Sequence, residues 1–182
     1  MLNENGRIPE FMQGKMLRKI MEDKVCAELI IHTFLNRSDL IIISNTYDSS
    51  NNFFALDSEN RLCRIMLQFA DSFDESEDFL NPYSNNFKDG NKYKNFLLIL
   101  DKDYMKLNKC GYFYHVDINQ ITDETVCRYA ELSIINIDYE GESPFSQLLC
   151  DLKCDDPDKI RNHALRRKIK EILEEQNSKE DE

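Results

Sequence analysis

The apolar residues of this chain are gathered into short runs of strand length, framed at both ends by segments with helical periodicity. No run approaches the roughly 20 residues that a membrane-spanning helix needs. Short apolar runs between polar turn formers are typical of β-strands, and apolar residues at every third or fourth position are typical of helices. The pattern predicts an α/β fold with no membrane segment.

The N-terminal part of this pattern predicts helix followed by strand. Apolar residues recur at near-helical intervals from Met16 to Leu35, which indicates one bent helix or two short ones. Asn36 tolerates the left-handed backbone conformation and should end the helix. The continuous apolar run Leu40–Ile43 then predicts a strand that is buried on both faces.

A β-hairpin is expected next, because residues 52–56 and 61–69 flank the turn formers 57–60. Alternation along the second strand separates two faces. One face should carry Cys63, Ile65, Leu67 and Phe69, and the other should carry Leu62, Arg64, Met66 and Gln68. Further strands are expected at residues 95–100, 112–118 and 131–137.

Two helices should close the chain. Ser143 and Pro144 have the types preferred at a helix cap and first turn, and so do Asp156 and Pro157. Apolar residues at helical spacing follow both pairs. The acidic end from Glu174 onward should fray.

We expect a single domain over residues 1–182, because this length suits one compact core. The polar ends 1–8 and 177–182 should be mobile, and the Pro/Gly/Asn-rich loop 81–92 should be flexible. The N-terminus lacks the basic and then apolar pattern of a signal peptide, which favours a cytoplasmic protein.

The six cysteines are scattered, and most lie inside apolar segments, so we expect reduced thiols. Cys150 and Cys154 are four residues apart and could reach one metal ion. No second Cys or His pair accompanies them, so a zinc site is not expected.

Three stretches, in order along the chain, follow the pattern of a known family. They are Met16–Asp23 with Glu28–Asn36, then Asn51–Gln68, and then Gly111–Asp117 with Thr125 and Glu131–Ile137. Together they resemble the recombination-promoting nuclease/putative transposase family of the PD-(D/E)XK nuclease superfamily. The resemblance covers most of residues 16–137. It implies a restriction-endonuclease-like central mixed sheet flanked by helices.

The resemblance also implies where the catalytic motif should lie. The superfamily holds Mg²⁺ or Mn²⁺ with an Asp on one strand and an Asp or Glu two residues before a Lys or Gln on the next. These positions fall on Asn52, Met66 and Gln68, so only Gln68 agrees with the motif. An inactive protein that binds a macromolecular partner, without a cofactor, is the leading hypothesis.

An active nuclease with relocated carboxylates is the alternative, and it would need Mg²⁺ or Mn²⁺. Asp48 and Asp57 are the nearest candidates for metal ligands, although a turn aspartate bonded to its own backbone is the commoner role for Asp57. His115 could act as a general base, but a half-buried structural histidine is more common. His32 and His163 lack a Cys or Ser partner that the sequence identifies.

The net charge of −11 favours a protein partner with basic groups over a phosphate backbone. The acidic segment 71–78 could itself dock on such a partner, which would make the chain an inhibitor or decoy. The last helix carries a local basic group that could touch nucleic acid, or form a solvated face with pairs such as Arg167–Glu171 and Lys170–Glu174. This group comprises Arg161, Arg166, Arg167, Lys168 and Lys170.

Overall fold

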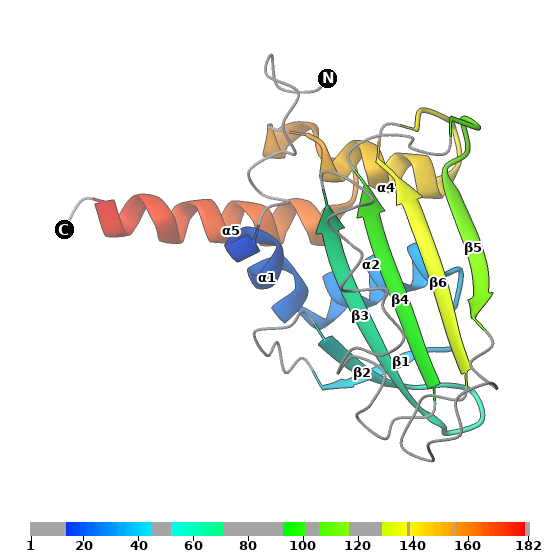
Figure 1. The fold of residues 1–182 in the computed structure, drawn as a ribbon. Helices are drawn as coiled ribbons and strands as arrows, with labels where there is room; N and C mark the ends of the chain where they lie inside the picture. Colours follow the sequence, from blue (N-terminus) through cyan, green and yellow to red (C-terminus); the bar gives the residue numbers. More distant parts are fainter. Residues whose placement is uncertain are drawn as a thin grey trace.

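The computed structural model describes residues 14–44, 52–70, 93–100, 106–116, 129–137, 139–154 and 156–180. Its helices are α1 (Gly14–Glu22), α2 (Lys24–Leu35), α4 (Pro144–Leu152) and α5 (His163–Glu180), with a 3₁₀ turn η3 (Pro157–Lys159). Its strands are β1 (Ile41–Ser44), β2 (Asn52–Leu56), β3 (Leu62–Ala70), β4 (Tyr93–Leu100), β5 (Gly111–Val116) and β6 (Tyr129–Asn136). The predicted α/β class and the order of elements are confirmed (Figure 1).

The six strands form one mixed sheet in the order β1-β2-β3-β4-β6-β5. β1, β2 and β3 are antiparallel neighbours, which confirms the predicted hairpin, whereas β3, β4 and β6 run parallel. β5 returns antiparallel to β6 and forms one edge, and β1 forms the other. The expected flexible loop 81–92, the N-terminal residues 1–8 and the acidic segment 71–78 lie outside the described residues.

The main core lies between one face of the sheet and the helices. Figure 1 shows these helices stacked behind the strands. Phe53, Ile65, Leu67, Leu97, Ile99 and Ile135 come from the sheet, and Ile20, Phe34, Leu149 and Leu165 are among the residues that the four helices contribute. The alternation predicted for residues 61–69 is confirmed for Cys63, Ile65 and Leu67, which share this core.

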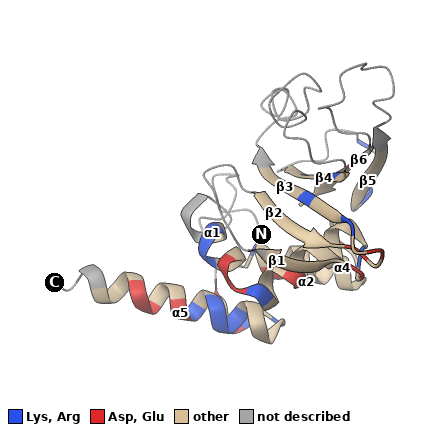
Figure 2. Cartoon of the chain, turned by 90° about the horizontal axis from the view of Figure 1, so that it is seen from below, with Lys and Arg blue, Asp and Glu red and all other residues tan. Residues whose placement is uncertain are grey.

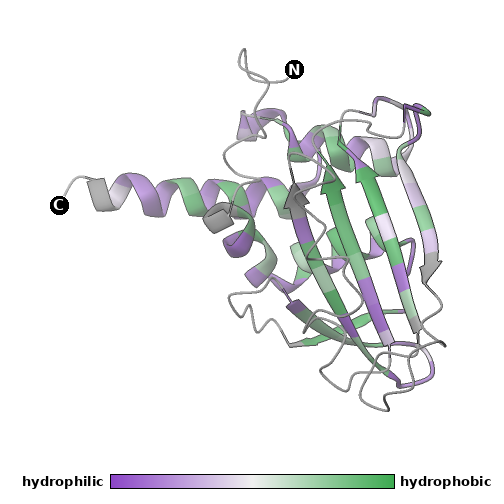
Figure 3. Cartoon of the chain, in the orientation of Figure 1, coloured by the Kyte–Doolittle hydropathy of each residue, from purple (hydrophilic) through white to green (hydrophobic). Residues whose placement is uncertain are grey.

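β4 is buried on both faces, as expected for a central parallel strand. Leu97 and Ile99 face the main core, while Leu98 and Leu100 join Ile134 in a smaller cluster on the opposite face. Figure 3 shows that β4 is hydrophilic where it begins and hydrophobic over the rest of its length. Met66, which is the neighbour of Phe96 on the adjacent strand, lies on this second face.

Asp23 divides the first helical segment into two. Its carboxylate accepts hydrogen bonds from the backbone N–H groups of Val25 and Cys26, both at 3.0 Å, and so caps α2. Asn36 ends α2 with φ 51° and ψ 40°, which confirms the predicted left-handed stop. Of the two possibilities left by the sequence, the structure has two short helices.

The prediction that residues 40–43 are buried on both faces is wrong. Leu40 and Ile42 are buried, but Ile41 and Ile43 are 57% and 51% exposed. The physical reason is position, because β1 is an edge strand and only one of its faces is covered. An uninterrupted apolar run therefore did not indicate a central strand here.

The predicted start of the last helix is also wrong. Asp156 accepts from Asp158 N at 3.0 Å, but it caps only the 3₁₀ turn η3. The helix begins at His163, where the Asn162 side chain accepts from Ala164 N and Leu165 N. Between the two caps, the buried carboxylate of Asp151 accepts from Arg161 N at 2.9 Å and Asn162 N at 2.8 Å. The chain is thereby bent back against α4 before α5 starts.

α5 also continues beyond Glu174, where we expected fraying, and ends at Glu180. Lys19 of α1 donates to the Glu175 carboxylate at 2.7 Å, and the Ser178 hydroxyl donates to the Glu174 carbonyl at 2.8 Å. These contacts stabilise the part of α5 that lies beyond its last core residues.

The described cysteines are free thiols, as predicted. Burial raises the pKa of the Cys26 thiol to about 12, so this residue is a protonated core side chain at neutral pH. Cys150 lies on α4, whereas Cys154 lies beyond its end and bonds to the Asp156 carbonyl. None of the helices in the described ranges combines the length and apolar character that crossing a bilayer requires.

The Asp151 contacts generate a stability prediction. Replacing Asp151 with Ala leaves two backbone N–H groups near the start of α5 without their acceptor, so the free energy of unfolding should fall by roughly 2 to 4 kcal/mol. Urea denaturation followed by circular dichroism measures this change. Glu174→Ala, at an exposed position of α5, is the matched control and should stay within about 0.5 kcal/mol of the wild type. Equal stabilities of the two variants would contradict the structural role of Asp151.

Candidate functional site

The structure brings the three motif positions together on the face of the sheet opposite the main core. Asn52 of β2 is the direct cross-strand partner of Met66 of β3, and Gln68 follows two residues later on the same face. Asn52 and Met66 are each only 1% exposed, while Gln68 is half-buried. The geometry therefore places the two expected carboxylate positions side by side, but neither carries a carboxylate.

Two basic residues lie beside these positions. Arg64 of β3 donates from Nε to the Asn52 Oδ1 at 2.7 Å. Its register partner on β4 is Lys94, so the two side chains start from the same face, and Lys94 is fully buried. Sequence reasoning did not single out Lys94, because a lysine just before an apolar run normally marks an exposed strand end. Its burial follows from the central position of β4.

A divalent cation does not fit this group of residues. The Asn52 oxygen already accepts from a guanidinium, and the Met66 thioether is a poor ligand for Mg²⁺. Within the described ranges, no group of three or more His, Cys, Asp or Glu side chains could hold a metal ion.

Asp57 has the structural role in a turn that the sequence analysis weighed against metal binding. Its carboxylate accepts from Glu59 N at 2.9 Å, Arg61 N at 2.8 Å and Arg61 Nε at 2.6 Å. Burial by itself raises the pKa of the Asp57 carboxyl, but the hydrogen bonds from Arg61 and Glu59 outweigh it and hold that pKa below its ordinary value. Asp57 also follows the opposite end of β2 from Asn52, so it does not face the motif positions.

The histidine candidates lie on elements other than the strands that carry the motif positions. Asp48 lies outside the described residues. His32 bonds through Nε2 to the Leu40 carbonyl at 2.6 Å and connects α2 to β1. His115 is on the edge strand β5, in register with Glu131, and His163 is exposed at the start of α5.

The basic residues of the last helix are largely occupied by local partners. Figure 2 shows them along the first part of α5, with acidic residues farther along. Arg167 pairs with Asp23 and Glu171, which confirms one predicted pair, while Lys170 pairs with Asp158. Lys168 lies 3.6 Å from Glu171, and Arg166 donates to the carbonyls of Ile160 and Arg161. This arrangement agrees with the interpretation of the last helix as a solvated face with local ion pairs.

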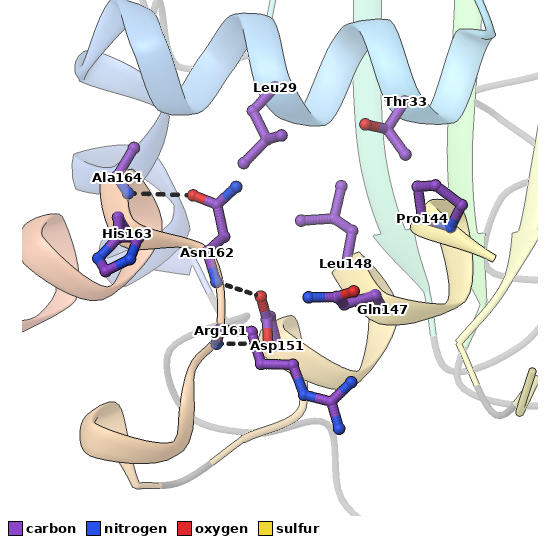
Figure 4. A pocket seen from close by; sticks show the side chains of 10 residues that line it. All are labelled: Leu29, Thr33, Pro144, Gln147, Leu148, Asp151, Arg161, Asn162, His163 and Ala164. Atoms are coloured by element: carbon purple, nitrogen blue, oxygen red, sulfur yellow. Dashed lines mark hydrogen bonds between the residues drawn. The ribbon is translucent and has the colours of Figure 1, made fainter. Parts of the chain in front are cut away.

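A groove of about 520 Å³ lies where α2, α4 and the start of α5 meet (Figure 4). Leu29 and Leu148 form apolar parts of its wall, and Arg161 and His163 are exposed beside it. Both oxygens of Asp151 are used by backbone N–H groups in this wall. The groove therefore has surface for contact but no free carboxylate at Asp151 for acid–base chemistry.

Comparison with known proteins identifies no relative: no family model, no curated protein and no solved structure matches this chain.

The Asp57 contacts predict a pH-dependent effect on stability. Because folding lowers the pKa of this carboxyl, its contribution is present above the unfolded pKa of about 3.9 and is lost as the pH falls through the lower folded value. Asp57→Asn should therefore be less stable than the wild type at pH 7, with a difference that shrinks below about pH 4. Chemical denaturation at both pH values measures it.

Glu59→Gln is the control for this measurement, because Glu59 is an exposed carboxylate of the same turn and pairs with the same arginine. It should change stability little at either pH. A destabilisation by Asp57→Asn that is as large at acidic as at neutral pH would contradict the assigned role of the charged carboxylate.

Proposed function

We propose that this protein is a PD-(D/E)XK nuclease-like domain without catalytic activity, which acts by binding a macromolecular partner. The observation that carries this proposal is the pairing of Asn52 with Met66, both buried, at the positions where the family resemblance requires two carboxylates. The fold supports it, because a mixed sheet with an antiparallel hairpin and parallel inner strands is compatible with a restriction-endonuclease-like core.

The chemistry at these positions argues against phosphodiester cleavage. Cleavage by this superfamily needs a metal ion to activate water and to neutralise the charge that develops on the phosphate. Asn52 and Met66 supply no negative charge, and Arg64 adds a positive one that already bonds to Asn52. An alternative in which Asp57 serves as a relocated ligand is disfavoured by the three hydrogen bonds that its carboxylate accepts.

The surface supports a binding role. Large apolar side chains are exposed at both edges of the sheet, including Ile41 and Ile43 on β1 and Phe113 and Tyr114 on β5. Exposed apolar side chains on unpaired edge strands are features of interaction surfaces. The net charge of −11 favours a partner with basic groups, since such charges steer association.

The proposal predicts that the purified protein does not cleave supercoiled plasmid, single-stranded DNA or RNA in Mg²⁺ or Mn²⁺. Isothermal titration with Mn²⁺ should likewise show no saturable binding, because the ligand charges are missing at Asn52 and Met66. Gel analysis of each substrate over time, against a sample without protein, measures cleavage.

Gln68→Ala and Asp48→Ala are the control variants that distinguish an active motif from a relocated site. Metal-dependent cleavage that disappears in Gln68→Ala would show an active motif and would refute the proposal. Cleavage that disappears only in Asp48→Ala would instead establish a relocated site. Cleavage that persists in both variants would point to a contaminating nuclease, which a second purification step removes before the assay is scored.

A further inference from the structure

The edge strand β1 leaves one side of its backbone unpaired within the described part of the sheet. Ile41 and Ile43 are 57% and 51% exposed, whereas Ile42 between them is buried in the main core. Edge strands commonly carry a charged residue or a proline, which hinders pairing with another chain. β1 carries neither, because it consists of three isoleucines and a serine. It can therefore act as a template for a further strand.

Hydrogen bonds in the β2–β3 turn identify the backbone groups that β1 points outward. Asp57 N donates to Arg61 O at 3.2 Å, so these two residues face each other as a hydrogen-bonded pair. Such pairs alternate along an antiparallel ladder, so the backbone groups of the next residue, Leu56, point away from β3 and toward β1. Leu56 is in register with Ile41, and the outward-pointing N–H and C=O groups therefore belong to Ile42.

Two features limit the length of this open edge. At its start, the Leu40 carbonyl is bonded to His32 Nε2 at 2.6 Å, in agreement with outward-pointing backbone groups at every second residue. At its end, the register of β1 with β2 shifts between Ile42 and Ser44, which marks a β-bulge. Ile42 is therefore the centre of a short open edge.

The open edge is complementary to itself. When two copies of β1 run antiparallel with Ile42 opposite Ile42 of the second copy, the N–H and C=O groups of these two residues can form two mutual hydrogen bonds. In the same register, Ile41 lies opposite Ile43 of the second copy, and β-branched side chains form favourable cross-strand pairs. The two copies are then related by a two-fold axis, which is the commonest symmetry among oligomers.

The described charged residues that precede β1 or lie in the β2–β3 turn form ion pairs. Arg37 donates to Asp39 through Nε at 2.7 Å and through Nη2 at 2.9 Å. Arg61 lies 2.6 Å from the Asp57 carboxylate and 2.9 Å from the Glu59 carboxylate. Neither β1 nor β2 contains a charged residue, and Figure 2 shows both strands in tan. Within the described part of the chain, the net charge of −11 is therefore not concentrated at this edge.

We propose that β1 pairs antiparallel with β1 of a second copy of this chain, about a two-fold axis beside Ile42, and that the two sheets thereby become one. The axis is perpendicular to the sheet, so the helices of both copies lie on one side and the faces with Asn52 and Met66 lie on the other. The ladder is short, so the dimer should form at micromolar concentrations. This inference goes beyond the proposed function, because it requires neither the family resemblance nor another macromolecule.

Sedimentation velocity of the full chain, between about 1 and 200 µM in reducing buffer, measures the association. The weight-average mass should rise with concentration from the 21.5 kDa of one chain toward that of a dimer. Hydrogen exchange at the Ile42 amide should slow as the dimer forms. Added salt should not weaken the dimer, because no ion pair crosses the edge and salt screens the repulsion between two acidic chains.

Two charge variants test the register. Ile41→Glu and Ile43→Lys should each raise the dissociation constant at least about tenfold, because each places two unpaired charges in the homodimer. A mixture of the two variants should form a heterodimer, in which the introduced glutamate and lysine lie opposite each other. Val25→Glu and Val25→Lys are the matched controls, since Val25 is 56% exposed on α2, and they should leave the dimer intact. Circular dichroism checks that each variant is folded.

Leu62→Lys distinguishes edge pairing from the packing of two sheets face to face. Leu62 is 45% exposed and shares a face with Ile41, because both are in register with Leu56. It belongs to β3, however, and strands about 4.8 Å apart place it about 10 Å from β1. Edge pairing predicts that Leu62→Lys changes the dissociation constant by less than about threefold.

The dimer inference is overturned if the wild type stays monomeric over the whole concentration range, or if Leu62→Lys or the Val25 variants weaken the dimer as much as Ile43→Lys does. Homodimers of Ile41→Glu or Ile43→Lys as tight as the wild type, or a mixture of these variants that forms no heterodimer, would contradict the proposed register. An Ile42 amide that exchanges slowly at every concentration in a monomer would also overturn the inference, because a segment of the same chain would then cover the edge.

Discussion

Burial of β4 on both faces is the constraint on which the rest of the structure depends. A strand that is apolar on both sides needs neighbours along both edges and a cover over both faces. β3 and β6 supply the edges, and the helices supply the cover over Leu97 and Ile99. The same central position draws Lys94 into the interior, beside Arg64, which donates to Asn52.

Carboxylates hold the turns and helix ends of this fold together. Asp23 caps α2 and also meets Arg167 of α5, Asp57 closes the β2–β3 turn, and Asp151 binds the backbone that leads into α5. Each of these groups accepts backbone N–H donors that would otherwise lack a partner near a chain reversal. These three acidic side chains are therefore structural elements of the turns and helix ends.

The two faces of the sheet have different chemical characters at their polar positions. On the face with Asn52 and Met66, the basic residues Arg64 and Lys94 lie beside the motif positions. On the helix-covered face, Glu131 and Ser133 line a pocket next to Phe113 of β5. One sheet carries both characters because alternate residues of each strand serve opposite faces.

Local features of the chain were predictable from the sequence. The left-handed stop at Asn36, the Ser143 cap and the hairpin around Asp57 depend on residues close together along the chain, and their side chains act on the nearby backbone. Two predictions from local sequence were wrong because contacts with distant parts of the chain determine the outcome. Ile41 is exposed because β1 lies at an edge of the sheet. Asp156 caps only a 3₁₀ turn because Asp151 binds the segment that follows. Strand order, the burial of Lys94 and the pocket beside Phe113 arise from contacts between elements far apart in the sequence. Only the tertiary structure determines them, because no local signal specifies which strand becomes a neighbour.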